Sequence, residues 1–351
     1  DIGLAVTGYF VSIPVFCDSA FVLLSPLAKR MSKDSGNSMV TMAVALAMGL
    51  HATHMLVPPT PGPLAVAGIL GSNLGLVILF GMLVSIPVTI VAVIAGRILG
   101  KKYYYLPKIE STEEVMTEIG DKKLPTPFMS FSPILLPIIL MLLRTIAMLD
   151  SAPFGKGVLY NILDALGQTI IALFIGLIIA FFTYKSVHSE DKEVWTFDGI
   201  FGEALKTAGQ IVLIVGAGGA FATVLRLSNL QDIVMNVFAG FSIGIIVPYI
   251  IGAIFRTAIG SGTVGMITAA SMLLPLLDVL GFNSPMGLVI AMLACAAGGF
   301  MVFHGNDDFF WVTVSTSDMK PEIAYKVFPL ISIFQSIVAL ICVYILKIIF
   351  L

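Results

Sequence analysis

The chain has 351 residues, of which 58% are hydrophobic and 11% are charged, and its formal net charge is -2. Together with a mean hydropathy of +1.02, this composition excludes an ordinary soluble domain and predicts an all-α polytopic membrane protein, with the lipid bilayer as its surroundings. The near-neutral charge, without basic runs that contain aromatic residues, argues against nucleic acid as a partner.

Six apolar runs are each near or above the roughly 18–20 residues that a helix needs to cross about 30 Å of hydrocarbon. They cover residues 38–58, 74–96, 131–149, 158–184, 285–303 and 327–350. Their length and lack of alternation argue against an outer-membrane barrel. The three cysteines lie in apolar segments without paired spacing, which indicates reduced packing residues rather than a disulfide or metal site.

Residues 1–26 are apolar, but a proline and an acid interrupt them between Ile13 and Ser19. A proline removes a backbone hydrogen bond within a span, so this segment is predicted to be a broken helix. The next span runs into the sequence HATHMLVPPTPGP at 51–63. Its prolines cannot continue a regular helix, which predicts an unwound or re-entrant segment at His54.

Two polar stretches follow, and they predict the topology. Residues 97–130 hold six cations and are expected to be a solvated loop with one short amphipathic helix; residues 185–206 hold three. The short loop 150–157 holds one, so the positive-inside rule places both longer loops in the cytoplasm and this loop outside. Glycines at the centre of 207–236 predict a re-entrant hairpin.

A break is also expected in RTAIGSGTVGMITAA at 256–270, where Arg256 precedes a Gly-Ser-Gly sequence by one turn. An arginine inside a membrane segment costs about 2.5–3.5 kcal/mol unless it faces a partner or water. A half-helix that begins near Thr263 would add a positive dipole end to the same cavity. The pattern favours an anion site, although Arg256 pairing with a protein acid or snorkelling remains an alternative.

The broken segments recur as a repeat. The segment 11–27 corresponds to 259–277, and His54 precedes His304 by 250 residues. The loops that follow the two segments differ in charge, which predicts an inverted-repeat transporter. We therefore divide the chain into 1–96 (rest of the first repeat and the following span), 97–130 (cytoplasmic linker) and 131–351 (second repeat and C-terminal span). The repeat offset also places the hairpin's counterpart before residue 1, so N-terminal truncation is expected.

Polar side chains within these segments are the candidate site residues. Those proposed to bind substrate are Arg256, Ser19, Ser261, Gly262, Thr263 and Asn306. Those proposed to carry a coupling proton are Asp18, His54, His304 and Asp307, with Asp18 preferred, because ionisable groups in apolar spans commonly serve as relays. Simpler alternatives stay open: a helix cap for Asp18, packing for the histidines His51 and His54, and an interfacial turn for residues 304–308.

Four segments resemble motifs of the gluconate:proton symporter family, which also contains permeases for related sugar acids and for D-serine. They are VSIPVFCDSAFVLLSPL at 11–27, HATHMLVPPTPGP at 51–63, RTAIGSGTVGMITAA at 256–270 and HGNDDFFW at 304–311. The resemblance covers essentially the whole chain and implies a longer N-terminus, re-entrant hairpins and a multi-pass location in the bacterial cytoplasmic membrane. The chain departs from the family pattern at Asp18, Thr60 and Asp308, where the family has a glutamate, a histidine and a small polar residue.

The leading interpretation is therefore proton-coupled import of gluconate or a related small sugar acid. Arg256 would neutralise the carboxylate, while Ser261, Thr263 and Asn306 would hydrogen-bond hydroxyls. A D-serine or glycerate permease is the alternative within the family. Sodium coupling and a homodimer stay open.

Two other classes fit the sequence less well. A membrane-embedded metal hydrolase would need the glutamate of an H-E-x-x-H site, which HATH lacks, and no other spacing groups three ligands. A passive channel suits broken helices in inverted halves less well than alternating access does. No enzyme activity, metal or cofactor is expected.

Overall fold

The computed structural model describes residues 1–13, 15–107, 125–148, 157–187 and 244–351, together with Gly155 and a few separate residues between 196 and 220. Within these ranges the regular structure is helical, and no strand occurs. The prediction of an all-α membrane protein is therefore confirmed. Nearly all of the predicted hairpin at 207–236 and most of the stretch 185–206 lie outside the described residues.

The chain forms two compact units. The first contains Asp1–Asn73, Phe80–Ile109 and Leu213–Leu351, and the second contains Leu74–Leu79 and Glu110–Val212.

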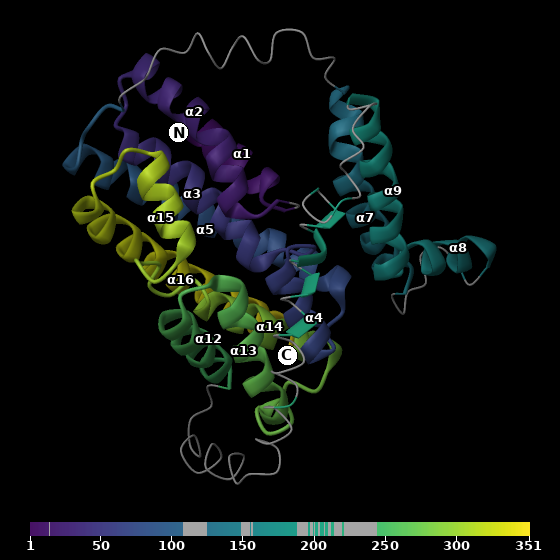
Figure 1. Ribbon diagram of the computed structural model, residues 1–351. Helices are drawn as coiled ribbons and strands as arrows, with labels where there is room; N and C mark the ends of the chain where they lie inside the picture. The colour runs from purple at the N-terminus through teal and green to yellow at the C-terminus, as the bar shows by residue number, and fades with distance from the viewer. Residues whose placement is uncertain are drawn as a thin grey trace. The chain divides into compact units, whose positions relative to one another are not determined.

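The described helices of the first unit follow one another in two sets of five (Figure 1). The first set is α1 (Ile2–Val11), α2 (Cys17–Ser35), α3 (Met39–Leu56), α4 (Pro61–Leu70) and α5 (Leu74–Lys102), whose first turns belong to the second unit. The second set is α12 (Ile246–Ile259), α13 (Gly262–Leu273) with the 3₁₀ turn η2 (Leu274–Leu276), α14 (Pro285–Gly298), α15 (Asp308–Thr316) and α16 (Pro321–Phe350).

The two sets repeat each other in order and in packing. Corresponding helices begin 244 to 247 residues apart. Helix α1 packs on α3 as α12 packs on α14, and the sets exchange partners where α4 lies against α13 and α15 lies against α2. This arrangement supports the repeat, while the inversion of one half relative to the other stays a prediction.

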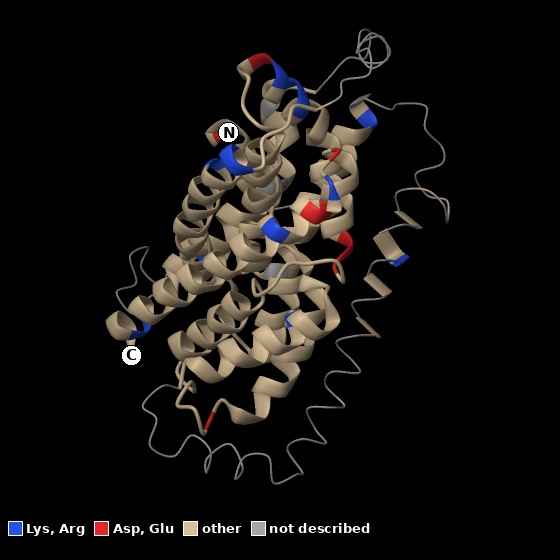
Figure 2. Cartoon of the chain, turned by 90° about the vertical axis from the view of Figure 1, so that its left-hand side faces the viewer, with Lys and Arg blue, Asp and Glu red and all other residues tan. Residues whose placement is uncertain are grey.

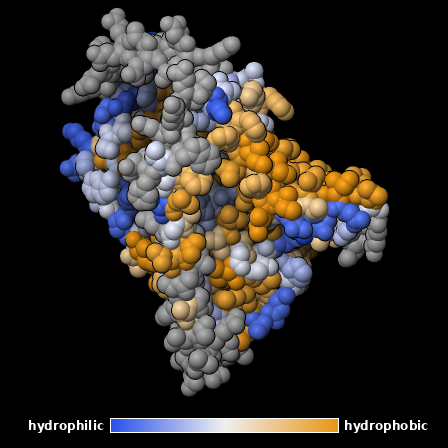
Figure 3. Space-filling model, turned by 45° about the vertical axis from the view of Figure 1, so that its right-hand side comes forward, coloured by the Kyte–Doolittle hydropathy of each residue, from blue (hydrophilic) through white to orange (hydrophobic). Residues whose placement is uncertain are grey.

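Among the described residues, three stretches are long and apolar enough to cross a membrane: Met39–Leu70, which contains the break between α3 and α4, Leu74–Lys102 and Pro321–Phe350. The exposed side of α5 carries aliphatic residues every three or four positions, which places them on one lipid-facing stripe. They are Leu79, Leu83, Ile86, Ile90, Ile94 and Ile98. Figure 2 shows how little of the described helices is charged, and Figure 3 shows a broad hydrophobic area over them.

The break between α3 and α4 follows from proline chemistry. The backbone carbonyl of His54 would ordinarily accept a hydrogen bond from residue 58, but Pro58 has no N–H. The hydroxyl of Thr60 lies 3.0 Å from that carbonyl oxygen and 2.6 Å from the carbonyl oxygen of Val57, and it donates to this pair of acceptors instead. The predicted interruption is thus confined to 57–60. Placing His54 in an unwound segment was wrong, because the helix continues to Leu56.

The break between α12 and α13 depends on Gly260, whose φ is +89°. A Cβ atom there would collide with the backbone of Asn306. Ser261 then caps α13, with its hydroxyl 3.5 Å from the N–H of Val264. The predicted break in the Gly-Ser-Gly sequence is confirmed. The predicted break near Ile13–Ser19 is confirmed too, because α1 ends at Val11 and α2 begins at Cys17, although Pro14 itself is not described.

The second unit contains α7 (Pro127–Ala147), α8 (Val158–Leu166) and α9 (Thr169–Val187), with α7 packed on α8 and α9. The apolar run at 158–184 is not one straight helix, since α8 and α9 differ in direction by 67° around Gly167; together they form either a broken span or a re-entrant loop. The predicted polar loop at 97–130 is also shorter than expected, because α5 runs to Lys102 and α7 starts at Pro127.

Candidate functional site

The N-terminal ends of short helices from both sets meet in the first unit. A Cβ at Gly62, in the first turn of α4, would lie 3.5 Å from the Cα of Thr263 in the first turn of α13. Phe309 at the start of α15 packs on Phe21 of α2, with ring centroids 6.0 Å apart. Each helix start carries the partial positive charge of a helix N-terminus, an arrangement that favours a bound anion.

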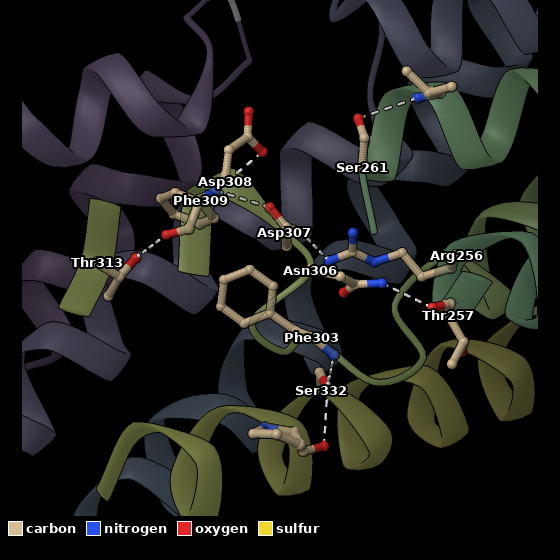
Figure 4. A network of polar contacts seen from close by, with 12 residues as sticks. Arg256, Thr257, Ser261, Phe303, Asn306, Asp307, Asp308, Phe309, Thr313 and Ser332 are labelled. Carbon is tan, nitrogen blue, oxygen red and sulfur yellow. Dashed lines mark hydrogen bonds and ion pairs between the residues drawn. The ribbon is translucent and has the colours of Figure 1, made fainter. Parts of the chain in front are cut away.

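Arg256 lies in the last turn of α12, next to this junction, and is 1% exposed. Its Nη2 atom lies 2.5 Å from Oδ2 of Asp307, which is 4% exposed (Figure 4). A buried guanidinium needs such a partner, since an uncompensated charge away from water is strongly destabilising. The alternative that Arg256 pairs with a protein acid therefore describes this structure.

The ion pair leaves most donors of Arg256 unused. The contact with Asp307 engages Nη2, whereas Nε and Nη1 have no hydrogen-bond partner among the described residues. A Cβ at Gly262 would be 4.0 Å from Nη1, so the guanidinium reaches the first turn of α13. Five donors in a planar fork match a carboxylate, so the donors that Asp307 does not engage suit a further anion.

Asp307 has a second role as the N-cap of α15. Its Oδ1 atom accepts a hydrogen bond of 2.8 Å from the N–H of Phe309, while Oδ2 faces Arg256. Asp308 also lies within 3.1 Å of that N–H through its own Oδ1, but it is exposed. The two neighbouring acids therefore differ in burial and in contact with the arginine.

The loop between α14 and α15 is attached to α12 and α15 by side-chain hydrogen bonds. Nδ2 of exposed Asn306 donates to the carbonyl of Thr257 at 2.9 Å, and Nε1 of Trp311 donates to the carbonyl of Gly305 at 2.8 Å. His304 is half-buried, and within the described residues its side chain makes no hydrogen bond or ion pair. The structure thus brings Asn306 and Asp307 to Arg256, but gives His304 no such contact.

Asp18 lies in the first turn of α2 and is half-buried. Its Oδ1 atom is buried and has no hydrogen-bond partner in the described part of the chain. Its charge interacts with those of Asp307 and Asp308, so three carboxylates share this region with one guanidinium. The adjacent Ser19 is exposed.

The two histidines of α3 are buried, with His51 at 2% and His54 at 5% exposure. The His51 ring lies 5.2 Å from the Phe300 ring and 5.4 Å from the Phe303 ring, which fits the packing alternative. His54 lies within electrostatic range of Arg256 and stays a candidate for coupling. The described residues contain no group of three or more His, Cys, Asp or Glu side chains that is suited to a metal ion.

Two contributors to the site were missed in the sequence. The Phe303 ring lies 5.7 Å from the Arg256 guanidinium carbon, within the range of a cation–π interaction, but nothing distinguishes this phenylalanine in the sequence. Gln335 of α16 is buried beside His51, and its amide donates to the carbonyls of Met48 at 3.2 Å and Val88 at 3.4 Å. A glutamine within an apolar span was the available indication.

Comparisons with known proteins agree with this picture. The model of a family described as GntP family permease matches residues 1–349. The chain is 37% identical over 335 residues to an uncharacterized permease of Haemophilus influenzae, an alignment covering 91% of this chain and 67% of the relative. It is 30% identical over 350 residues to a gluconate permease of Pseudomonas aeruginosa, with coverages of 99% and 76%. It is 30% identical over 345 residues to the D-serine transporter DsdX of Escherichia coli K12, with coverages of 97% and 75%.

These relatives are transport proteins rather than enzymes, and the apolar helices make this chain a multi-pass protein of the bacterial cytoplasmic membrane. The resemblance noted in the sequence motifs is confirmed over nearly the whole length. The chain belongs to the GntP family of permeases.

Proposed function

We propose that this permease is a secondary active transporter that imports gluconate or a related small sugar acid together with protons. The observation that carries the proposal is the buried guanidinium of Arg256, whose Nε and Nη1 donors lack hydrogen-bond partners among the described residues. A substrate carboxylate would satisfy these donors and the positive N-terminal end of α13 at once.

Nearby polar groups suit the hydroxyls of a sugar acid. Ser261 and Thr263 lie at the start of α13 and are half-buried. The side-chain nitrogen of Asn306 donates a hydrogen bond to the carbonyl of Thr257. Its side-chain oxygen is therefore the atom suited to accept a hydrogen bond from a substrate hydroxyl. Ser19 is exposed in the first turn of α2. Relatives in Pseudomonas aeruginosa and Bacillus subtilis are named gluconate permeases, which supports this substrate class.

The test is uptake of labelled gluconate into proteoliposomes that contain the purified protein. An imposed pH gradient, acidic outside, should drive accumulation above equilibrium, and a protonophore should abolish that accumulation. If gluconate only reached equal concentrations on both sides whatever the pH gradient, proton coupling would be contradicted. Failure to transport gluconate or any related aldonate would contradict the substrate class.

A second candidate is D-serine transport, because the carboxylate of Asp18 suits an ammonium group. Its buried Oδ1 has no hydrogen-bond partner among the described residues. D-Serine and glycerate share a carbon skeleton and differ by an amine or a hydroxyl. Stronger competition by D-serine would favour this candidate, whereas stronger competition by glycerate and gluconate would favour the sugar acid.

A further inference from the structure

We propose that Arg256 and Asp307 form the switch that couples substrate to protons: the substrate carboxylate replaces Asp307 on Arg256, and the released Asp307 carboxylate binds the proton. This inference rests on the proposed function and adds the coupling group and a stoichiometry of one proton for each monocarboxylate. The proton binds from the side on which the substrate enters, and both leave on the other side.

Charge balance in the buried site is the first argument. Arg256 and Asp307 are 1% and 4% exposed, and their opposite charges cancel. A substrate carboxylate that arrived alone would place two carboxylates against one guanidinium, and a proton alone would leave the guanidinium uncompensated; both are costly away from water. Only the empty pair and the pair with both ligands are neutral. The binding site is therefore expected to change from one side of the membrane to the other only when both substrate and proton are bound or when neither is bound.

The two oxygens of Asp307 allow the switch to operate without unfolding α15. Oδ1 accepts the capping hydrogen bond from Phe309, and Oδ2 faces Arg256. A proton on Oδ2 removes the attraction to the guanidinium and leaves Oδ1 free to keep the cap. Because α15 packs against α2 of the other set, a change at Asp307 reaches both halves of the repeat.

Asp307 is favoured over the other acids because it contacts Arg256, whereas Asp18 is half-buried and Asp308 is exposed. The other titratable groups that face Arg256 or Asp307 electrostatically from the packed helices are Asp308 of α15, Cys17 and Asp18 of α2, and His51 and His54 of α3.

The test compares Asp307→Asn with Asp308→Asn in proteoliposomes. Asparagine keeps a capping oxygen and mimics the protonated acid, so Asp307→Asn should exchange labelled gluconate across the membrane. It should no longer accumulate gluconate in response to a pH gradient, because its empty form holds an uncompensated guanidinium and does not return across the membrane. Asp308→Asn alters an exposed neighbour and should accumulate gluconate like the wild type. Proton uptake on binding, followed with a pH-indicator dye in detergent, should be close to one per gluconate in the wild type and absent in Asp307→Asn.

Each outcome separates the proposals. If Asp307→Asn accumulates gluconate like the wild type, or takes up a proton on binding it, the switch is wrong. Loss of gluconate binding in a folded Asp307→Asn protein also overturns it, because removing the competing carboxylate should strengthen binding. If wild-type protein neither binds nor exchanges gluconate or a related aldonate, the proposed function fails instead.

Discussion

At the scale of single residues, a buried guanidinium selects a ligand by shape as well as by charge. Arg256→Lys keeps the positive charge but loses the planar fork, so the apparent affinity for gluconate should fall roughly tenfold or more. The reason is that charge-assisted hydrogen bonds contribute about 1.5–3 kcal/mol each. The measurement is the concentration dependence of uptake, and Arg256→Ala should nearly abolish transport while the protein remains inserted.

The control for this substitution is the uncharged amide of gluconate. If Arg256 contacts the carboxylate, the lysine variant should lose affinity for the acid and change little for the amide. Equal losses for both ligands would mean that Arg256 only holds Asp307 and the loop before α15.

A second residue-scale prediction concerns the close approach of α12 and the loop at Asn306. Gly260 and Gly281 both have positive φ, at +89° and +78°, but a Cβ would meet backbone only at Gly260. Gly281→Ala should cost about 1–2 kcal/mol for the left-handed conformation. Gly260→Ala should cost about 1–3 kcal/mol more from overpacking. Thermal unfolding in detergent measures both losses. Equal decreases in melting temperature for the two variants would show that the backbone of Asn306 leaves room for a Cβ at position 260.

At the scale of elements, a broken helix is stable only when its freed carbonyls find donors. Thr60→Val removes the hydroxyl that serves the carbonyls of His54 and Val57, so it should lower the free energy of unfolding by about 1–3 kcal/mol. Thr268→Val is the matched control, because that hydroxyl donates to a carbonyl four residues earlier on α13. A similar loss in both variants would contradict a special role for Thr60.

The breaks were predictable because their causes are local. Prolines without N–H groups and a Gly-Ser-Gly sequence show where a helix ends, and the structure breaks near 12–16, 57–60 and 260–261. Local chemistry did not predict that α3 stays helical through His51 and His54 as far as Leu56. It also did not predict the bend at Gly167.

The partner of Arg256 was harder to predict. Asp307 is 51 residues away along the chain, and only the packing of α12 beside the loop before α15 brings them together. From the sequence alone, Asp18 was therefore the preferred coupling acid, whereas the ion pair is the basis for proposing Asp307.

At the scale of the whole molecule, the repeated order of helices explains why the site contains residues from both ends of the chain. Helix α4 meets α13, and α15 meets α2, so each set supplies helix starts to the other. The site is therefore expected to need both halves, as in transporters built from inverted repeats.

The last prediction tests the topology that such an inversion requires. Positive-inside counting places 97–130 in the cytoplasm and 150–157 outside. Lys102→Cys and Gly157→Cys introduce thiols at exposed positions in the two regions, after the native Cys17, Cys295 and Cys342 are replaced by serine. A membrane-impermeant maleimide added to intact cells should label Gly157→Cys but not Lys102→Cys, and both should react once the cells are permeabilised. Labelling of only Lys102→Cys from outside would mean that the orientation is the reverse of the one predicted. Labelling of both variants from outside would contradict the membrane span predicted between them.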